Sequence, residues 1–217
     1  MRIENLKNLE KLDKIKFRVI NKFPYIVKIN NLLTDGEIKE ILELAKGKFE
    51  QSNIVVDGQL VYNTGQRSSS TAYLFKDGMP DVYSKRIERI IKKICYLGSC
   101  QREQLEIMCV RYRQGEFFGK HVDYFEDNEV NILDKGGNRI ATFFVYLNTL
   151  EKSDGGETEF TKLGIKSRPK KGDAVFFINK NFETGEMIPQ TEHQGNPVLT
   201  DTVKYGLNIW IRSDPFF

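Results

Sequence analysis

The feature that most constrains this chain is a change of hydrophobic period near residue 100. Before that point, apolar residues recur at helical spacing. After it come four segments rich in β-branched and aromatic residues and separated by turn residues: "LEIMCVRY", "RIATFFVYLN", "DAVFFIN" and "YGLNIWIR". Such runs are typical of strands. Helices followed by many strands predict an α+β domain with a strand-built barrel or sandwich, and with the helices packed on one face of a sheet.

Two helices and a hairpin are expected before residue 100. "TDGEIKEILELAK" begins with Thr34 and Glu37 at capping-box spacing. Its apolar face is formed by Ile38, Ile41, Leu42 and Ala45. A second helix fits residues 80 to 96, with Pro80 in its first turn and Gly98 placed to end it. Its stripe is formed by Ile87, Ile90, Ile91 and Ile94. "NIVVDGQLVY" predicts a hairpin around Asp57-Gly58.

The chain of 217 residues has the size of one domain. We expect residues 1–20 to form a polar N-terminal lead-in and residues 21–217 to form a single domain. The net charge is only +3, with acids and bases interspersed, which does not suggest a nucleic-acid partner. The oligomeric state is left open by the sequence.

The chain carries the marks of a cytoplasmic protein. Its N-terminus lacks the apolar core of a secretory signal, and no apolar run approaches the ~18 residues of a membrane span. Its three cysteines, Cys95, Cys100 and Cys109, do not form a disulfide framework. We therefore expect a reducing, cytoplasmic location and no association with membranes.

Only two histidines occur in the chain, and one lies in "GKHVDYF". His121 and Asp123 are two residues apart, so in a strand they share a face. Two histidines and one carboxylate on one side of a divalent metal leave positions open, as in non-haem iron oxygenases. The other histidine, His193, is the candidate third ligand. The alternative is a His-Asp pair in a turn or salt bridge, because His-x-Asp alone is a weak signal.

Lys204 adds a second indication. An iron(II) oxygenase needs two further electrons to reduce dioxygen, and 2-oxoglutarate is a common source. Its far carboxylate then needs a buried cation. Lys204 begins "KYGLNIWIR", where it shares a face with Gly206, Asn208 and Trp210. A lysine facing inward is costly unless it is paired, and a dicarboxylate would pair it. A surface lysine at a strand end is the alternative.

Taken together, these residues resemble the prolyl 4-hydroxylase branch of the Fe(II)/2-oxoglutarate-dependent dioxygenases. The resemblance covers about residues 24 to 212 and rests on six motifs in order: "TGQRSSS", "RYRQGEFFGKHVDYF", "RIATFFVYLN" followed by "GGETEF", "PKKGDAVFF", "HQGNPVL" and "KYGLNIW". Two features depart from the family pattern. Phe118 stands where the family usually has tyrosine, and the stretch from His193 to Lys204 is one residue longer.

The resemblance implies a double-stranded β-helix, or jelly-roll, core with flanking helices. It implies His121, Asp123 and His193 as iron ligands, and Lys204 as the partner of the 2-oxoglutarate C5 carboxylate. The positions implied to line the 2-oxoglutarate pocket are Tyr112, Thr142 and Tyr146. Those implied to contact the peptide substrate or to shape its groove are Arg67, Ser69, Arg139 and Trp210. Tyr146 and Trp210 as core aromatics, and Arg67 as a surface charge, are the alternatives.

The activity implied by the resemblance is hydroxylation of peptidyl proline to 4-hydroxyproline, with release of succinate and CO2. The cofactors implied are Fe(II), 2-oxoglutarate as co-substrate, O2, and ascorbate as reductant. Two alternatives stay open. One is another 2-oxoglutarate oxygenase, a lysyl hydroxylase or a nucleic-acid demethylase. The other is a jelly-roll peptide-binding protein without turnover. A collagen-like chain, a short proline-rich repeat and a single proline in a globular protein all fit as the proline-bearing substrate.

Overall fold

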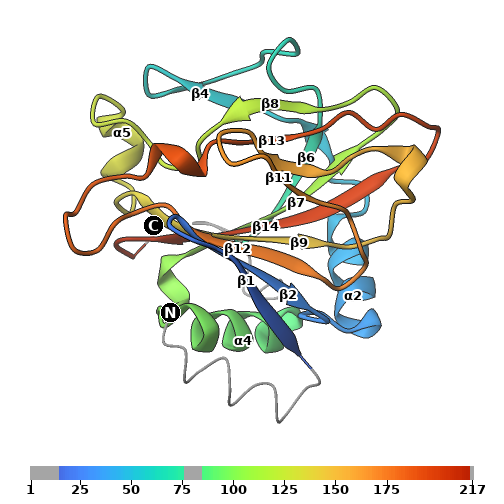
Figure 1. Cartoon of the computed structure of the whole chain (residues 1–217), viewed down its shortest axis with the longest axis horizontal. Coiled ribbons are helices and arrows are strands. Elements are labelled where there is room, and N and C mark those ends of the chain that lie inside the picture. The colour runs from blue at the N-terminus through green and yellow to red at the C-terminus, as the bar shows by residue number, and fades with distance from the viewer. Residues whose placement is uncertain (1–14, 76–84, 216–217) are drawn as a thin grey trace.

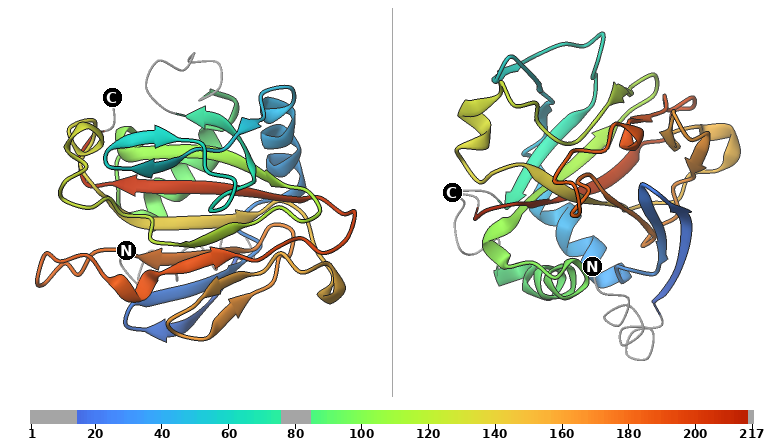
Figure 2. Two further views of the ribbon diagram at one scale, coloured as in Figure 1. Left: turned by 90° about the horizontal axis from the view of Figure 1, so that it is seen from above. Right: turned by 60° about the vertical axis from the view of Figure 1, so that its left-hand side comes forward.

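The computed structural model describes residues 15–75 and 85–215. Two β-sheets face each other, and two helices cover the outer side of the larger sheet (Figures 1 and 2). The larger sheet has eight strands, in the spatial order β1 (Lys16–Lys22), β2 (Tyr25–Asn30), β12 (Ala174–Ile178), β9 (Arg139–Tyr146), β14 (Lys204–Arg212), β7 (Leu105–Tyr112), β6 (Ser70–Phe75) and β3 (Glu50–Gln51).

The smaller sheet and the remaining elements complete the architecture. The smaller sheet has four strands, in the order β11 (Ile165–Ser167), β10 (Thr158–Phe160), β13 (His193–Gly195) and β8 (Phe118–His121). A separate hairpin joins β4 (Ile54–Val56) to β5 (Gln59–Val61). The helices are α2 (Asp35–Ala45), α4 (Glu88–Gly98) and the short α5 (Val130–Leu133), with 3-10 turns η1 (Arg102–Gln104), η2 (Lys152–Asp154) and η3 (Pro189–Thr191). The expected α+β jelly-roll with helices on one sheet is thereby confirmed.

The capping box, the hairpin turn and the isoleucine stripe predicted from the sequence are present in the structure. The Thr34 side chain accepts the Glu37 N–H, and the Glu37 carboxylate accepts the Thr34 N–H at 2.8 Å, which is the predicted capping box. Asp57 and Gly58 both have positive φ at the hairpin tip. The isoleucine stripe of α4 is buried as predicted. Pro80, the expected first turn of that helix, lies outside the described residues.

The central strands β7, β9 and β14 send alternate side chains to opposite sides of the larger sheet. In β9, Phe143 and Val145 pack in the core beneath the helices, whereas Phe144 and Tyr146 pack between the two sheets. This period of two is the one expected for strands buried on both faces. One side of the sheet therefore stabilises the helices, and the other side faces the interior of the jelly-roll.

The first strand, β1, begins at Lys16, inside the range expected as a polar lead-in. It pairs along its length with β2, so these residues belong to the larger sheet. The division of the chain at residue 20 stays a prediction. Within residues 15–75 and 85–215, no helix has both the length and the apolar character that a membrane span requires.

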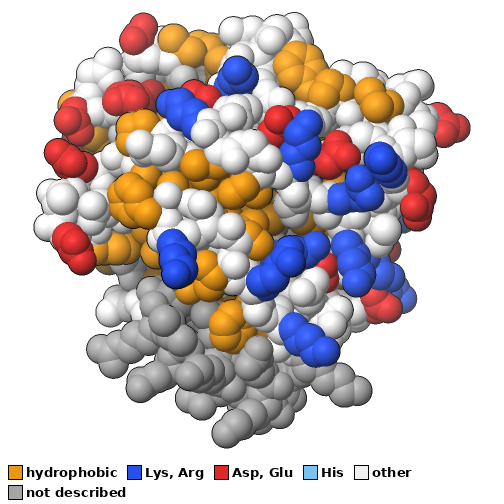
Figure 3. All heavy atoms as spheres, in the orientation of Figure 1, with side chains coloured by type: hydrophobic (Ala, Val, Ile, Leu, Met, Phe, Trp, Pro, Cys, Tyr) orange, Lys and Arg blue, Asp and Glu red, His pale blue; other side chains and the backbone are white. Residues whose placement is uncertain are grey.

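Basic side chains lie over β1, β2 and β11 on the face drawn in Figure 3, with acidic side chains among them. Two basic residues of these strands, one in β2 and one in β11, are in ion pairs. The Lys28 Nζ lies 3.7 Å from the Asp173 carboxylate, and the Lys166 Nζ lies 3.3 Å from that of Glu159. The charges of this face are thus partly compensated by neighbours, as their interspersion in the sequence suggests.

Candidate active site

Three ligand-type side chains converge between the two sheets. β13 pairs with β8 so that His193 lies directly opposite His121. Asp123 follows β8 by two residues, and one ligand atom from each of the three residues lies within 4.8 Å of the others. The Nε2 atom of His121 is 3.7 Å from Oδ1 of Asp123, and that of His193 is 3.9 Å from Oδ2. Both imidazoles thus direct the same nitrogen toward one carboxylate.

The backbone sets the tautomer of each imidazole. Nδ1 of His121 lies 2.8 Å from the Gly119 carbonyl oxygen, and Nδ1 of His193 lies 2.9 Å from that of Thr191. A carbonyl only accepts, so each Nδ1 carries the hydrogen and each Nε2 keeps a free lone pair. Burial, helped by the neighbouring His193, lowers the pKa of His121 to about 3. That histidine is therefore neutral near pH 7, which is the form that binds metals.

Asp123 is held in its charged form. Burial alone would raise the pKa of Asp123. The opposing effects of His193, His121, Arg139 and the Thr142 hydroxyl are larger together, so the net pKa lies below the ordinary value. The Thr142 hydroxyl donates to Oδ2 of Asp123 at 2.7 Å. One anionic carboxylate and two neutral imidazoles form a donor set suited to a divalent first-row metal.

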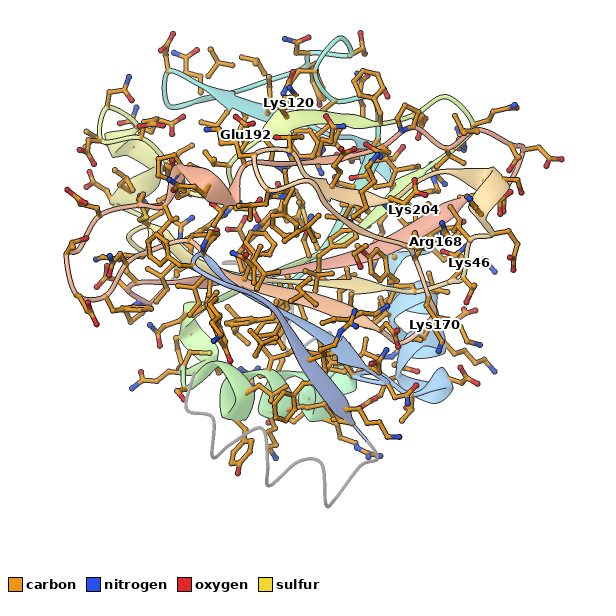
Figure 4. The ribbon with its side chains drawn as sticks, in the orientation of Figure 1. Lys46, Lys120, Arg168, Lys170, Glu192 and Lys204 are labelled. Carbon is orange, nitrogen blue, oxygen red and sulfur yellow. The ribbon has the colours of Figure 1, made fainter. Side chains whose placement is uncertain are left out.

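Lys204 lies at the start of β14, between the two sheets (Figure 4). Its side chain is fully buried, and its Nζ has no hydrogen-bond partner among the described residues. Nζ lies 4.8 Å from the ring centre of Tyr112 and 5.2 Å from that of Phe144. Burial lowers the pKa of this amine to about 7. A buried, unpaired ammonium is costly, so the site fits an anionic ligand.

A small cavity of about 20 Å³ joins Lys204 to the two histidines. It is lined by Tyr112, Phe118, His121, Phe144, Thr158, His193, Gln194, Gly195, Lys204 and Asn208. An ammonium group and two imidazoles therefore lie in the walls of one shared space. The unpaired amine fits an anionic group, and the imidazoles fit a metal ion.

A larger cavity of about 310 Å³ lies on the other side of His121 and Asp123. Its walls include Arg67, Arg139 and Trp210, together with residues of the β4–β5 hairpin. The Arg139 guanidinium lies 3.5 Å from the centre of the Trp210 ring. It also donates to both oxygens of Glu106, at 2.7 Å and 3.1 Å. Arg139 is therefore fixed at the cavity wall by an ion pair and a stacked ring.

Arg67 is fixed in a similar way. Its Nε donates to the Ser69 hydroxyl at 3.0 Å, and its Nη1 donates to the Asn53 carbonyl at 3.1 Å. The guanidinium lies 4.4 Å from the centre of the Phe118 ring. Phe118 in turn stacks on His121 with the ring centres 3.5 Å apart. Phe118, where the family usually has tyrosine, thus separates Arg67 from the histidine.

Of the other residues expected at the site, one lines the small cavity and the rest contact residues of the site without lining it. Tyr112 lines the small cavity with Lys204. Thr142 binds Asp123 and Ser69 binds Arg67, and neither residue lines the small or the larger cavity. The Tyr146 hydroxyl is 3.0 Å from Oγ1 of Thr158 and 3.1 Å from the Ser167 carbonyl, which places it behind the cavity wall.

Several residues of the site were not singled out from the sequence. Phe144 lines the small cavity, Glu106 holds Arg139, and Asn179 donates to Thr142. Strand alternation had placed Asn208, which also lines the small cavity, on the face of Lys204, and it could have indicated Phe144 in the same way, because Phe144 shares a face with Thr142. The contacts of Glu106 and Asn179 carry no local signal, since their partners lie far away in the chain.

Comparison with known proteins agrees with this site. The family model of the 2OG-Fe(II) oxygenase superfamily matches residues 107–212. Prolyl 4-hydroxylase 2 of Arabidopsis thaliana is 30% identical over 223 residues, which cover 93% of this chain and 71% of the relative. The chain belongs to the prolyl 4-hydroxylase family. The cofactors of that family are Fe(II) and 2-oxoglutarate, with O2 as oxidant and ascorbate as reductant, and the donor set and the unpaired Lys204 fit them.

Other relatives of the family differ in length. Prolyl 4-hydroxylase subunit alpha-2 of Caenorhabditis elegans is 33% identical over 205 residues, which cover 93% of this chain and 36% of that subunit. This chain therefore spans about a third of the animal subunit. The crystal structure of a viral collagen prolyl hydroxylase from Paramecium Bursaria Chlorella virus-1, in complex with 2OG, superposes with a TM-score of 0.62. It is 28% identical, and the match covers 86% of this chain and 95% of that one.

Proposed function

We propose that this chain hydroxylates a peptidyl proline to 4-hydroxyproline while 2-oxoglutarate is converted to succinate and CO2. The observation that carries the proposal is the shared cavity of Lys204 and the two histidines. A buried amine without a hydrogen-bond partner among the described residues lies at one end of that cavity. A dicarboxylate is the ligand that satisfies both ends.

Each residue of the site has a role in this proposal. His121, Asp123 and His193 hold Fe(II), with the imidazole Nε2 atoms and the carboxylate oxygens as ligands. The bound iron supplies the oxidising power toward the substrate C–H bond. Lys204 binds the C5 carboxylate of 2-oxoglutarate, and Tyr112 lies beside that ammonium in the cavity wall. Thr142 orients Asp123, which keeps the anionic ligand in place.

The proline-bearing chain binds in the larger cavity. That cavity adjoins His121 and Asp123, and its size accommodates a short stretch of peptide. Trp210 offers an aromatic surface, and Arg67 and Arg139 offer guanidinium donors for peptide carbonyls. A proline-rich chain is already extended in the polyproline II form, so its ordering on binding costs little.

The test is succinate release by the purified chain with Fe(II), ascorbate and 2-oxoglutarate, with and without poly(L-proline) and Gly-X-Pro peptides. We expect peptide-stimulated succinate together with a product heavier by one oxygen atom on proline. Succinate without a hydroxylated peptide would keep the oxygenase chemistry and reject these peptides as substrates. No succinate despite bound iron would reject the catalytic proposal and favour a peptide-binding role.

A further inference from the structure

Two of the three cysteines meet at the end of α4, on the opposite side of the larger sheet from the iron site. The helix ends at Gly98, and the next residue, Ser99, has left-handed φ and ψ values of 53° and 45°. The N–H of Cys100 then turns back to donate to the Cys95 carbonyl at 3.1 Å. This six-to-one hydrogen bond is that of the Schellman motif.

The Schellman motif brings two side chains into contact, those of the third residue from the helix end and of the second residue beyond it. An apolar pair usually fills these positions. Here they are filled by Cys95 and Cys100, whose thiols are near enough for each to shift the pKa of the other. Disulfides require α-carbons about 4.4–6.8 Å apart. A backbone hydrogen bond that joins the same two residues holds them near that range.

Both thiols are accessible enough to react. Cys95 and Cys100 are each half-buried, whereas Cys109 is fully buried in the core. The neighbouring Cys100 thiol lowers the pKa of Cys95, which favours the Cys95 thiolate as the first nucleophile, whereas the same contact, together with burial, raises the pKa of Cys100. Burial raises the pKa of Cys109 to about 12. The chain thus contains an adjacent, reactive pair and, in Cys109, an internal reference thiol that is protected.

We propose that Cys95 and Cys100 are a site of reversible oxidation, at which exchange with a small disulfide of the glutathione type forms an intramolecular disulfide. In the first step the Cys95 thiolate attacks the small disulfide, forms a mixed disulfide and releases one thiolate. In the second step the Cys100 thiolate attacks the sulfur of Cys95 and releases the second small thiolate. The small disulfide is reduced to two thiols, and the protein loses two hydrogens.

The bond would close the turn that connects α4 to η1 and β7. It would hold the end of α4 where the side chains of Cys95 and Cys100 already pack against the helix-covered core. The pair lies outside both cavities of the active site. We therefore expect oxidation to increase resistance to unfolding without changing succinate release, so the outcome is independent of the proposed function.

The experiment treats the purified full chain with oxidised glutathione and then quenches it with a thiol-alkylating reagent. Trypsin leaves both cysteines in one peptide, residues 94–102, because no lysine or arginine lies between them. We expect this peptide to be lighter by two hydrogens and to carry no alkyl group. Cys109 should be alkylated only after denaturation, and dithiothreitol should restore both thiols.

Three variants make the test specific. Cys109→Ala keeps the pair and should behave as the wild type does. Cys95→Ser and Cys100→Ser should each stop at a mixed disulfide with glutathione on the remaining thiol. A wild-type peptide that retains a glutathione adduct, or that appears only in disulfide-linked dimers, would overturn the proposal, as would two thiols that stay reduced at every glutathione ratio.

Discussion

The hydroxyl of Thr142 donates a hydrogen bond of 2.7 Å to Oδ2 of Asp123. The same hydroxyl accepts a hydrogen bond of 3.1 Å from the side-chain amide of Asn179. A threonine hydroxyl has one hydrogen, so the bond from Asn179 directs that hydrogen toward the carboxylate. Asn179 is fully buried and does not touch Asp123 itself, which makes it a positioning residue for the proposed metal ligand.

The first prediction concerns this relay. In Asn179→Ala the Thr142 hydroxyl can turn away, and we expect metal affinity to fall by about 10- to 100-fold. Titration with Fe(II) or Mn(II) under anaerobic conditions measures it. Asn181→Ala is the control, because the Asn181 side chain accepts from the Glu183 N–H, outside the relay. Equal metal affinities in the two variants would exclude a positioning role for Asn179.

A second prediction concerns the anionic ligand. Asp123→Ala should abolish turnover, because the metal loses its only carboxylate among the three proposed ligands. Asp127→Ala is the matched control, since Asp127 is exposed in the same loop. Succinate release with Fe(II) in excess is the measurement. Full activity of Asp123→Ala under these conditions would refute the ligand assignment.

Lys204→Ala should sharply weaken the use of 2-oxoglutarate. Removing one partner of a buried ion pair costs roughly 3–5 kcal/mol. That cost corresponds to about two to four powers of ten in affinity. The Michaelis constant for 2-oxoglutarate is the readout, and Lys170→Ala, which changes an exposed lysine, is the control. An unchanged constant in Lys204→Ala would place the C5 carboxylate elsewhere.

The depressed pKa of Lys204 predicts a pH dependence. Without ligand its pKa is about 7, because burial disfavours the ammonium. A carboxylate binds the protonated form, so the Michaelis constant for 2-oxoglutarate should rise above pH 7, by at most about tenfold per pH unit. His121, with a pKa of about 3, stays neutral across this range and adds no slope. Lys204→Arg should make the Michaelis constant for 2-oxoglutarate nearly independent of pH in this range, because arginine stays charged. An equally steep pH dependence in that variant would assign the slope to another group.

The last prediction concerns the close packing of Gly206 against Phe144. A Cβ atom at this position would lie 2.5 Å from Cζ of Phe144, which lines the small cavity. Gly206→Ala should therefore move Phe144, lower stability by about 1–3 kcal/mol and weaken 2-oxoglutarate binding. Gly36→Ala in α2 is the control, since nothing lies within 4 Å of its Cβ position. Thermal unfolding and the 2-oxoglutarate constant check both effects; a Gly206→Ala protein with wild-type values would show that Phe144 has free space to move.

The sequence predicted most of the fold because the signals of its elements are local. The capping box of α2, the isoleucine stripe of α4 and the turn at Asp57-Gly58 each lie within a few residues. Alternation along β14 correctly placed Lys204 and Trp210 on the interior side of the larger sheet. These features follow from backbone geometry alone.

The approach of Asp123 to the histidines could not be derived in the same way. β8 ends at His121, so strand alternation does not fix the direction of Asp123. Its position depends on the pairing of β8 with β13 and on the hydrogen bond from Thr142. The contact of Glu106 with Arg139 likewise joins two strands, β7 and β9, that are separated in space by β14. Such contacts depend on the assembled sheet and carry no local pattern.

The two-sided use of β7, β9 and β14 has a consequence for how such a chain can diverge. Neighbouring positions in these strands are under different selective pressures. The side chain at one position packs beneath a helix, and the side chain at the next faces the interior of the jelly-roll. A lineage can therefore exchange the interior-facing residues that serve neither the metal nor 2-oxoglutarate, and acquire a new target while the helix-facing residues preserve the fold. Along these three strands, we expect the variability between relatives to alternate from one residue to the next. Interior-facing positions should vary with substrate specificity, and helix-facing positions should be restricted by packing.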